Sequence, residues 1–279
     1  MLPDPHEENR RSWNAATKAH NSHKRDQAQV LAAGGHTLFS EEITLLGDVR
    51  GKSVVHLQCN AGQDTLSIAS LLGAQVTGID ISDEAIAFAR GLSAESGIPA
   101  EFVRSDLFDW FDHTQATFDV VYTGYGALNW LSDINRWARG VAKILRGRLV
   151  VIEFHPVMGM FTDEGFQLEG DALGGTHTIW DEGGGDYVAA TGDVDAHFPY
   201  EPGMTDFTNP HRAHEWMWGI GDVIGAVLAA GLTLRHFTEY PYSNGFRRFP
   251  QMRALPGRRF AMPEDLPAIP MMYSLVAER

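Results

Sequence analysis

The chain has 279 residues, 44% of them hydrophobic and 21% charged, so it is long enough to bury a large core and has the composition of a soluble globular protein. Its 22 Lys and Arg residues against 36 Asp and Glu residues give a formal net charge of −14, which repels phosphate backbones and disfavours nucleic acid as a partner. No apolar run approaches the ~20 residues that cross a bilayer, the amino terminus lacks the apolar stretch of a signal peptide, and the single cysteine excludes internal disulfides, so we expect a cytoplasmic protein without a membrane partner.

The polar segment 1–47 comes first and is predicted to be an N-terminal cap. From residue 48 to 155, apolar strands alternate with helical patterns, as is typical of a parallel sheet covered by helices on both faces. These strands are predicted at 53–58, 74–80, 100–106, 118–124 and 148–154.

Three helices are predicted between these strands. The first runs from about Asp64 to Leu72. The second is capped by Ser82, carries acidic residues in its first turn and extends to about Ser96. The third buries one apolar face and is predicted to end at Gly147.

The remaining chain divides at about residue 215. Segment 156–215 is rich in Gly, Asp and Pro and is predicted to be a lid or acceptor-binding insertion, because long irregular loops are uncommon otherwise. Segment 216–279 contains a helix at 221–231 and strands at 232–240 and 271–279, which complete the sheet with an antiparallel edge strand. The predicted fold is therefore a doubly wound, mostly parallel, seven-stranded α/β sheet with a lid insertion.

A candidate binding site lies at the turn after the first strand, in the sequence VVHLQCNAGQDTL. The dinucleotide signature G-x-G-x-x-G is absent, because its glycines are replaced by Gln58, Asn60 and Gln63. Asp80 lies 18 residues beyond Gly62, close to the ~20-residue spacing at which an acid reaches the ribose of a bound adenosine. Polar side chains and carbonyls at this turn suit the sulfonium and amino-acid tail of S-adenosylmethionine better than a pyrophosphate.

At these residues the chain resembles the class I S-adenosylmethionine-dependent methyltransferases, and within them a bacterial small-molecule group with a first motif of the HLQCNAGQDTL type. The resemblance covers 54–154 and, more loosely, the helix near 214–232 and the final strands. It implies a Rossmann-like methyltransferase fold and S-adenosylmethionine as cofactor. His56 departs from the acid usual at its position in the family, and Gln58 and Asn60 depart from glycines.

The resemblance also implies which residues bind the cofactor. The turn would hold the methionine portion, the acid after the second strand the ribose hydroxyls, and the acid after the third strand the adenine amine. The predicted cofactor-binding residues are Gln58, Asn60, Gly62, Asp80, Ile81, Asp106, Leu107 and Thr123. In the cap, the segment 12–24 is interpreted either as folding over the cofactor or as a solvated polar helix.

Catalytic and acceptor-binding residues are predicted from their position and chemistry. His155 ends the fifth strand and could take a proton near neutral pH, with Glu153 orienting it; Tyr125 follows the fourth strand and could contact the methyl group or the acceptor. The predicted acceptor-binding residues are Tyr125, His155, Trp216, Trp218 and Tyr242. Such aromatic side chains favour a flat aromatic or heteroaromatic acceptor.

Several assignments stay open from the sequence. Oxygen, nitrogen and carbon are all acceptor atoms that in-line methyl transfer could use, and a homo-oligomer is compatible with the chain. His211 and His214 lack a third ligand at recognisable spacing, so no metal is predicted. The arginines between 247 and 259 are interpreted as solvated loop residues, with recognition of a carboxylated substrate as the alternative. The rival functions are an NAD(P)-dependent oxidoreductase and a non-catalytic ligand-binding protein with the same fold.

Overall fold

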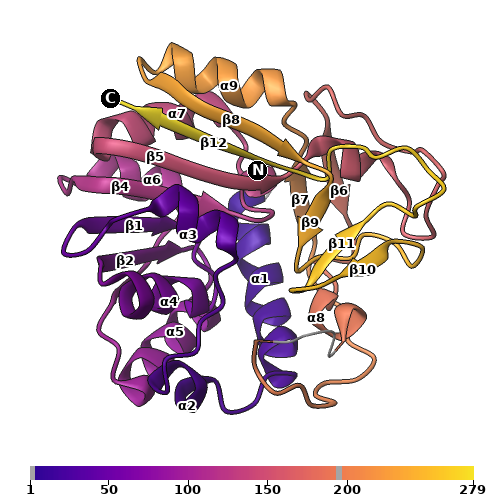
Figure 1. Cartoon of the computed structure of the whole chain (residues 1–279), viewed down its shortest axis with the longest axis horizontal. Helices are drawn as coiled ribbons and strands as arrows, with labels where there is room; N and C mark the ends of the chain where they lie inside the picture. Colours follow the sequence, from indigo (N-terminus) through magenta and orange to yellow (C-terminus); the bar gives the residue numbers. More distant parts are fainter. Residues whose placement is uncertain (1–3, 193–196) are drawn as a thin grey trace.

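The computed structural model describes residues 4–192 and 197–279 and shows a central sheet flanked by helices (Figure 1). The helices in these ranges are α1 (Pro5–Ser22), α2 (Gln27–Ala32), α3 (Ser40–Leu46), α4 (Gln63–Leu72), α5 (Asp83–Ser96), α6 (Leu107–His113), α7 (Ile134–Ile144), α8 (Tyr187–Thr191) and α9 (Ile220–Ala229). Short 3₁₀ turns span Leu128–Trp130 and Pro156–Met160. Within the same ranges, no helix is long and apolar enough to cross a membrane.

The central sheet has seven strands in the order β3-β2-β1-β4-β5-β12-β8. Its strands are β1 (Ser53–Leu57), β2 (Gln75–Asp80), β3 (Glu101–Arg104), β4 (Phe118–Gly124), β5 (Leu145–Phe154), β8 (Thr233–Tyr240) and β12 (Met272–Glu278). β12 runs antiparallel to both β5 and β8, whereas the other neighbouring pairs are parallel. The predicted seven-stranded, mostly parallel sheet is confirmed, and its antiparallel strand lies next to the edge strand β8.

The core lies on both faces of this sheet. On one face, α6, α7 and α9 pack against apolar side chains of the central strands. On the other face, α3 and α4 cover the sheet, and α5 packs beside α4 over β3. Burial of valine, isoleucine and leucine side chains on both faces explains why the strands read as continuous apolar runs. Because β1 to β5 run parallel to one another, their carboxyl ends share one edge of the sheet.

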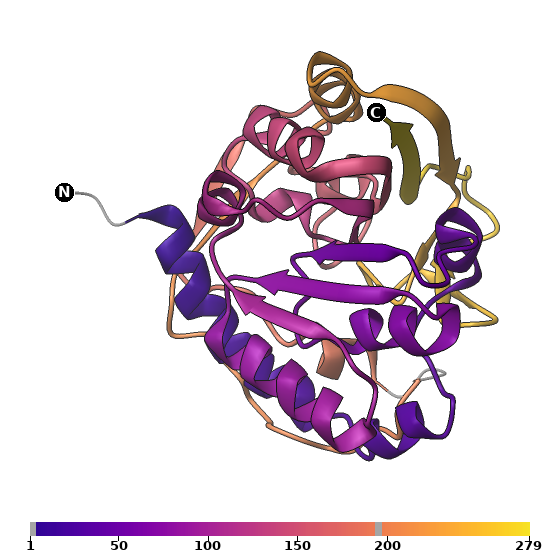
Figure 2. The ribbon, with the colours of Figure 1, turned by 90° about the vertical axis from the view of Figure 1, so that its left-hand side faces the viewer.

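The N-terminal segment forms three helices in its described part, and α1 lies along α5 (Figure 2). Asp4 caps α1 by accepting a hydrogen bond from the His6 amide at 3.0 Å. The inward face of α1 is polar, with Asn9, Ser12 and Thr17 among its buried residues. A polar buried face gives no apolar stripe in the sequence, so the helix is hard to predict from periodicity.

The insertion between β5 and α9 contains regular structure that we did not predict. β6 (His177–Trp180) pairs antiparallel with β7 (Ala213–Trp216). A three-stranded sheet formed by β9 (Tyr242–Asn244), β10 (Arg253–Leu255) and β11 (Arg259–Ala261) lies further along the chain. In Figure 1, both small sheets and α8 stand beside one end of the central sheet.

One predicted helix end is wrong. We expected Gly147 to end the third helix, but α7 ends at Ile144 and β5 begins at Leu145. A Cβ atom on Gly147 would lie 2.5 Å from the Asp119 carbonyl oxygen. The glycine therefore permits close approach of β5 to β4, where the register of the two strands shifts.

Candidate active site

The turn after β1 has an unusual backbone. Gln58 and Asn60 both adopt positive φ angles, 55° and 48°, and Gly62 follows at 81°. Asparagine tolerates this left-handed conformation better than most residues, whereas glutamine does so at a steric cost. The Asn60 amide donates a 2.8 Å hydrogen bond to Asp80 Oδ2, so the turn is tied to the end of β2.

Gln58 presents an unused hydrogen-bonding atom at this turn. Its Nε2 donates to the Ala127 carbonyl at 2.8 Å, whereas its buried Oε1 has no hydrogen-bond partner among the described residues. A buried acceptor without a donor costs free energy unless a ligand or water supplies one. Gln58 Oε1 is thus available to a donor group bound at the turn.

Gly62 has a packing role. A Cβ atom at this position would lie 2.7 Å from the Ala89 Cβ atom and 2.9 Å from the Phe102 ring. The glycine lets the start of α4 approach α5 and β3 closely, and it does not line the cavity described below. Its predicted contact with the cofactor is therefore replaced by an indirect contribution to the shape of the turn.

Asp80 ends β2 with both carboxylate oxygens engaged. Oδ2 accepts from the Asn60 amide and Oδ1 accepts from the Ser82 amide, each at 2.8 Å. Burial raises the pKa of Asp80 to about 6, although these two amide donors act in the opposite direction. The carboxylate oxygens retain lone pairs for further donors such as hydroxyl groups.

Asp106 links β3 to two other elements. Its Oδ1 caps α6 by accepting from the amides of Phe108 and Asp109 at 2.8 and 3.1 Å, and its Oδ2 lies 2.5 Å from His6 Nδ1 in α1. Burial alone would raise the pKa of Asp106, but His6 and the two amides hold it below its ordinary value. The predicted ligand of the adenine amine is therefore also a docking point for α1.

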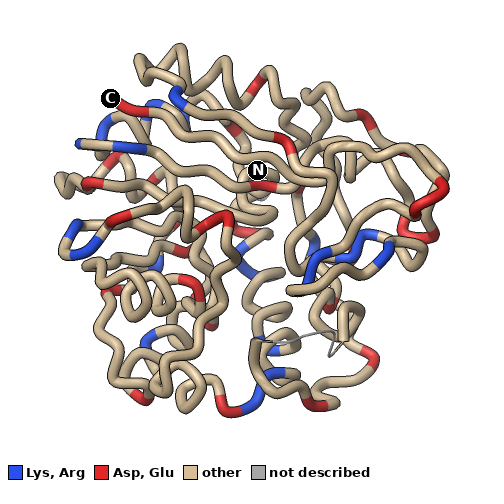
Figure 3. The backbone as a smooth tube through the Cα atoms, in the orientation of Figure 1, with Lys and Arg blue, Asp and Glu red and all other residues tan. Residues whose placement is uncertain are grey.

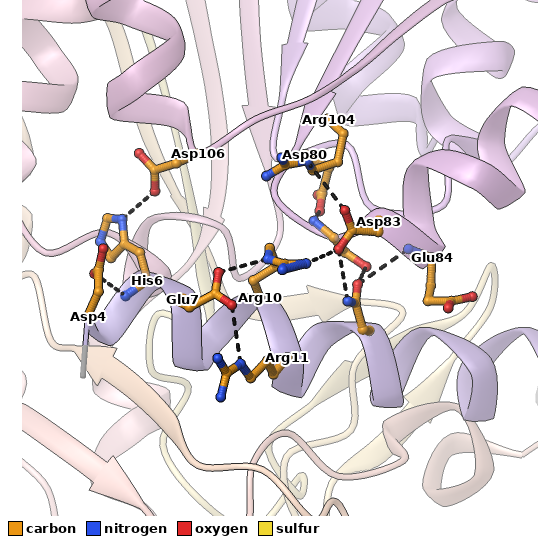
Figure 4. A network of polar contacts seen from close by, with 12 residues as sticks. Asp4, His6, Glu7, Arg10, Arg11, Asp80, Asp83, Glu84, Arg104 and Asp106 are labelled. Atoms are coloured by element: carbon orange, nitrogen blue, oxygen red, sulfur yellow. Dashed lines mark hydrogen bonds and ion pairs between the residues drawn. The ribbon is translucent and has the colours of Figure 1, made fainter.

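Figure 4 shows the polar contacts that attach α1 to the ends of β2 and β3. Arg10 forms an ion pair with Asp83, and Asn14 Nδ2 donates to the same carboxylate at 3.0 Å. Ser82 Oγ donates to Asn14 Oδ1 at 2.7 Å. These contacts join residues about 70 positions apart, and they place the polar inner face of α1 over the carboxyl edge of the sheet.

A cavity of about 940 Å³ lies between this edge, α1 and the insertion. Among the predicted residues, those that line it are Gln58, Asn60, Asp80, Ile81, Asp106, Leu107 and Tyr125. Thr123 does not line it; the residue is buried in β4, and its Oγ1 has no hydrogen-bond partner among the described residues. Most of the predicted cofactor-binding set thus converges on one cavity.

Tyr125 lies at the cavity wall with a positive φ of 51°. Its hydroxyl donates to Glu42 Oε2 at 2.9 Å and accepts from Asn244 Nδ2 at 3.0 Å. Glu42 also accepts hydrogen bonds from the Tyr122 hydroxyl and the Phe39 amide, both at 2.7 Å. Burial raises the pKa of Glu42 to about 8. Glu42 was not predicted, because nothing in the sequence places α3 against the residue after β4.

Glu153 holds the segment that follows Tyr125. Its buried carboxylate accepts hydrogen bonds from the amides of Gly126, Ala127, Leu128 and Phe154. Burial raises the pKa of Glu153, and the amides oppose this effect. Since Glu153 does not line the cavity, it shapes the wall and does not orient His155 as we predicted.

His155 does not line the cavity. Its Nε2 lies 3.0 Å from Glu239 Oε1 on β8, and its Nδ1 accepts from the Val157 amide at 3.2 Å. Burial lowers the pKa of His155, against the attraction of the Glu239 carboxylate. The predicted general base and acceptor contact is thus a strand-end histidine that caps a 3₁₀ turn.

Three of the four aromatic residues predicted to bind the acceptor also lie elsewhere, Tyr125 being the exception. Trp216 stacks on His177 with ring centroids 4.6 Å apart, Trp218 Nε1 donates to the Leu131 carbonyl at 3.0 Å, and Tyr242 donates to Glu41 at 2.6 Å. None of the three predicted residues lines the cavity. Its aromatic lining is instead Trp13, Phe39, Trp130, Phe154, Tyr187, Phe198, Tyr200, Phe246 and Phe249, besides Tyr125.

The cavity wall is also rich in polar atoms that lack partners. Buried atoms without a hydrogen-bond partner in the described chain, on residues that line the cavity, include Thr17 Oγ1, His20 Nδ1, Gln58 Oε1, Asn129 Oδ1 and His197 Nε2. Such atoms fit a ligand with several donors and acceptors. In the described ranges, no group of three or more His, Cys, Asp or Glu side chains is arranged to hold a metal ion.

Residues 54–148 match a family described as Methyltransferase domain. A ubiquinone biosynthesis O-methyltransferase of Shewanella halifaxensis (strain HAW-EB4) is 34% identical over 77 residues, which is 28% of this chain and 32% of that protein. The O-methyltransferase cnsE of Penicillium expansum is 29% identical over 140 residues, 48% of this chain and 49% of that protein. The chain therefore spans at most about half the length of these relatives.

Two solved structures share the fold over most of their length. An S-adenosylmethionine-dependent methyltransferase from Mesorhizobium loti aligns with a TM-score of 0.55 and 20% identity, covering 85% of this chain and 94% of that chain. A putative enzyme of the same description from Listeria monocytogenes aligns with a TM-score of 0.54 and 19% identity, covering 86% and 96%. The chain thus has the fold of these methyltransferases, and its residues 54–148 match the methyltransferase-domain family.

Proposed function

We propose that this protein transfers a methyl group from S-adenosylmethionine to a small aromatic or heteroaromatic molecule bound in the same cavity. The observation that carries the proposal is the convergence of Gln58, Asn60, Asp80 and Asp106 on one cavity at the carboxyl ends of β1, β2 and β3. In open parallel sheets, ligands bind at this edge. The matching domain and the fold of the similar structures support the same reaction class.

The cavity fits S-adenosylmethionine better than a dinucleotide. Three of the acids that line the cavity, Asp64, Asp80 and Asp106, lie in the part formed by the strand ends and the start of α4, where they would repel a pyrophosphate. The same carboxylates, with Gln58 Oε1, offer acceptors for ribose hydroxyls and for an ammonium group. We assign Asp80 to the ribose, Ile81, Asp106 and Leu107 to the adenine, and the Gln58 turn to the methionine portion.

When bound, S-adenosylmethionine supplies an electrophilic methyl group. The protein's contribution is to hold the acceptor in line with this group and to exclude water, which can provide much of the acceleration. We assign the acceptor contact to Tyr125, which lines the cavity; its hydroxyl donates to Glu42 and accepts from Asn244, so one lone pair of the oxygen is left for a further donor. A hydroxyl acceptor could donate to this oxygen, and the two relatives named as O-methyltransferases favour oxygen as the methylated atom.

Calorimetric titration of the purified protein with S-adenosylmethionine, S-adenosylhomocysteine and NADH tests the cofactor before any acceptor is known. Micromolar binding of the first two and none of NADH is expected. A screen of phenolic and heteroaromatic metabolites with methyl-labelled cofactor then tests turnover. Binding of NADH alone would favour an oxidoreductase, and cofactor binding without turnover of any acceptor would favour a non-catalytic ligand-binding protein.

A further inference from the structure

Lys24 is a cation in the wall of the cavity that forms no ion pair within residues 4–192 and 197–279. It lies two residues beyond the end of α1, and its backbone forms a bridge with Tyr200 of the insertion. Its ammonium group forms no ion pair with any described residue, and burial lowers its pKa to about 8. Lys24 is half-buried, so part of its hydration is lost without an ion pair in return, and an anion bound in the cavity would offset this cost.

The nearest acids are already engaged. Asp64 and Asp186 attract Lys24 from beyond ion-pair distance. The Thr37 hydroxyl donates to Asp64, whereas Asp186 lies 2.8 Å from His23 Nε2 and caps α8 through the Ala189 amide. Their attraction therefore offsets only part of the cost of burying Lys24, and a ligand anion could supply the rest.

Aromatic and cationic groups surround this part of the cavity. Arg258 lies over the Phe39 ring at 5.7 Å and is close enough to Lys24 to repel it. The His197 ring meets Phe39 edge-on at 5.6 Å, and burial lowers its pKa to about 4, so it is neutral near pH 7. These groups would hold a flat ring beside an anionic substituent.

The arginines in and around the three-stranded sheet add further positive charge to this part of the cavity. Figure 3 shows Lys and Arg side by side along β10 and β11, although the whole chain is acidic. Arg247, Arg248 and Arg258 line the cavity, whereas Arg253 and Arg259 pair with Glu264 and Glu41. The cluster that we interpreted as solvated loop residues thus contributes three members to the cavity wall.

We infer that the methyl acceptor carries a carboxylate on an aromatic body, with the carboxylate at Lys24 and the ring against Phe39. This inference rests on the proposed function and narrows its substrate class. The α-carboxylate of the cofactor is a second possible source of the same chemistry. The acceptor is favoured because Lys24 belongs to the part of the cavity wall formed by the cap and the insertion, which also carries the rings of Trp13, Tyr187 and Tyr200, and the methionine tail has no ring.

The test uses matched carboxylate and carboxamide probes on the full chain saturated with S-adenosylhomocysteine. The pairs are 4-hydroxybenzoate with 4-hydroxybenzamide, and 3-hydroxy-2-naphthoate with its amide. Titration of the wild type, Lys24→Met and Lys18→Met is compared, with thermal melting as the check on folding. Lys18 is a suitable control because it pairs with Glu84 at the surface and its side chain is 59% exposed.

In at least one pair, the wild type and Lys18→Met are expected to bind the carboxylate about tenfold to a hundredfold more tightly than the amide, as for a hydrogen bond to a charged group. Lys24→Met should lose this preference and keep its affinity for S-adenosylhomocysteine within about twofold. No carboxylate preference in the wild type, or a preference that survives in Lys24→Met, would overturn the inference.

Two further outcomes separate the sources. A tenfold weaker affinity of Lys24→Met for S-adenosylhomocysteine, with the probe preference intact, would assign Lys24 to the cofactor carboxylate and overturn the acceptor assignment. If the wild type binds no S-adenosylhomocysteine, the proposed function fails on its own. The probe pairs would then be titrated against the unliganded protein, and the same preference decides whether Lys24 binds a carboxylate.

Discussion

The pH dependence of cofactor binding follows from the environment of Asp80. Burial raises its pKa from the ordinary value of 3.8 to about 6 in the protein without ligand. Ribose hydroxyls donate hydrogen bonds, so they bind the ionised carboxylate better than the protonated one. With a pKa near 6, about a tenth of Asp80 is ionised at pH 5, and the affinity should fall about tenfold between pH 7.5 and pH 5.

Calorimetric titration with S-adenosylhomocysteine between pH 5 and 7.5 measures this change, since the ligand keeps its own charge across that range. Asp80→Asn retains one carbonyl acceptor and cannot ionise. We expect its affinity at pH 7.5 to be about tenfold weaker than that of the wild type and to show no loss at pH 5. Asp112→Asn, at an aspartate whose side chain is 60% exposed, should behave like the wild type.

The stability of the protein should change in the opposite direction with pH. Because the folded-state pKa of Asp80 is raised, its contribution to the free energy of unfolding is present below pH 4 and is lost as the pH rises through about 6. The difference in unfolding free energy between the wild type and Asp80→Asn should therefore decrease over this window. A pH-dependent affinity in Asp80→Asn equal to that of the wild type would refute the ribose assignment.

Three further predictions follow from the packing and hydrogen bonds of the site. Gly62→Ala should destabilise the protein by roughly 2–5 kcal/mol in urea unfolding, because the new side chain is strained by the left-handed backbone and overpacks its neighbours. As a control, Gly91→Ala, at an open position inside α5, should stabilise the protein by about 0.5–1 kcal/mol. Equal effects of the two substitutions would contradict the tight packing described for Gly62. Burial raises the pKa of Glu42 to about 8, so ionisation of its carboxyl destabilises the folded protein. The difference in unfolding free energy, wild type minus Glu42→Gln, should therefore fall between pH 5 and pH 9. A rise in this difference would contradict the raised pKa. His155→Gln should keep S-adenosylhomocysteine affinity and turnover within about twofold of the wild type, because His155 contacts Glu239 on β8. A large loss of turnover would show that His155 takes part in catalysis.

The sheet and the first turn were accessible from the sequence because their signals are local. Continuous apolar runs identify β1, β4 and β5, and the Ser82 cap marks the start of α5 within one residue. Asp80 and Asp106 could be identified because each follows a parallel strand, and the carboxyl ends of such strands form the ligand-binding edge of the sheet. Their positions at the cavity needed no knowledge of long-range contacts.

The other half of the cavity was not accessible in this way. Glu42 meets Tyr125 across 83 positions, and His6 meets Asp106 across 100. His155 and Trp216 have residue types suited to catalysis or ring binding, yet the fold turns them toward β8 and β6. Residue type predicted chemistry for these side chains, whereas packing decided whether they face the cavity.

This division explains why the cofactor is easier to infer than the acceptor. The half of the cavity that we assign to the cofactor is built from strand ends, whose positions the sheet dictates. The half that we assign to the acceptor is built from α1, the segment around Lys24 and loops of the insertion, whose contacts join residues far apart in the sequence. Changes in these elements can alter ring size or charge at the acceptor position while Asp80 and the Gln58 turn stay in place. The side chains that best report the acceptor are therefore polar and charged groups of this second half whose hydrogen bonds or charge are not satisfied within the protein. Lys24 is such a group, because its ammonium forms no ion pair with any described residue.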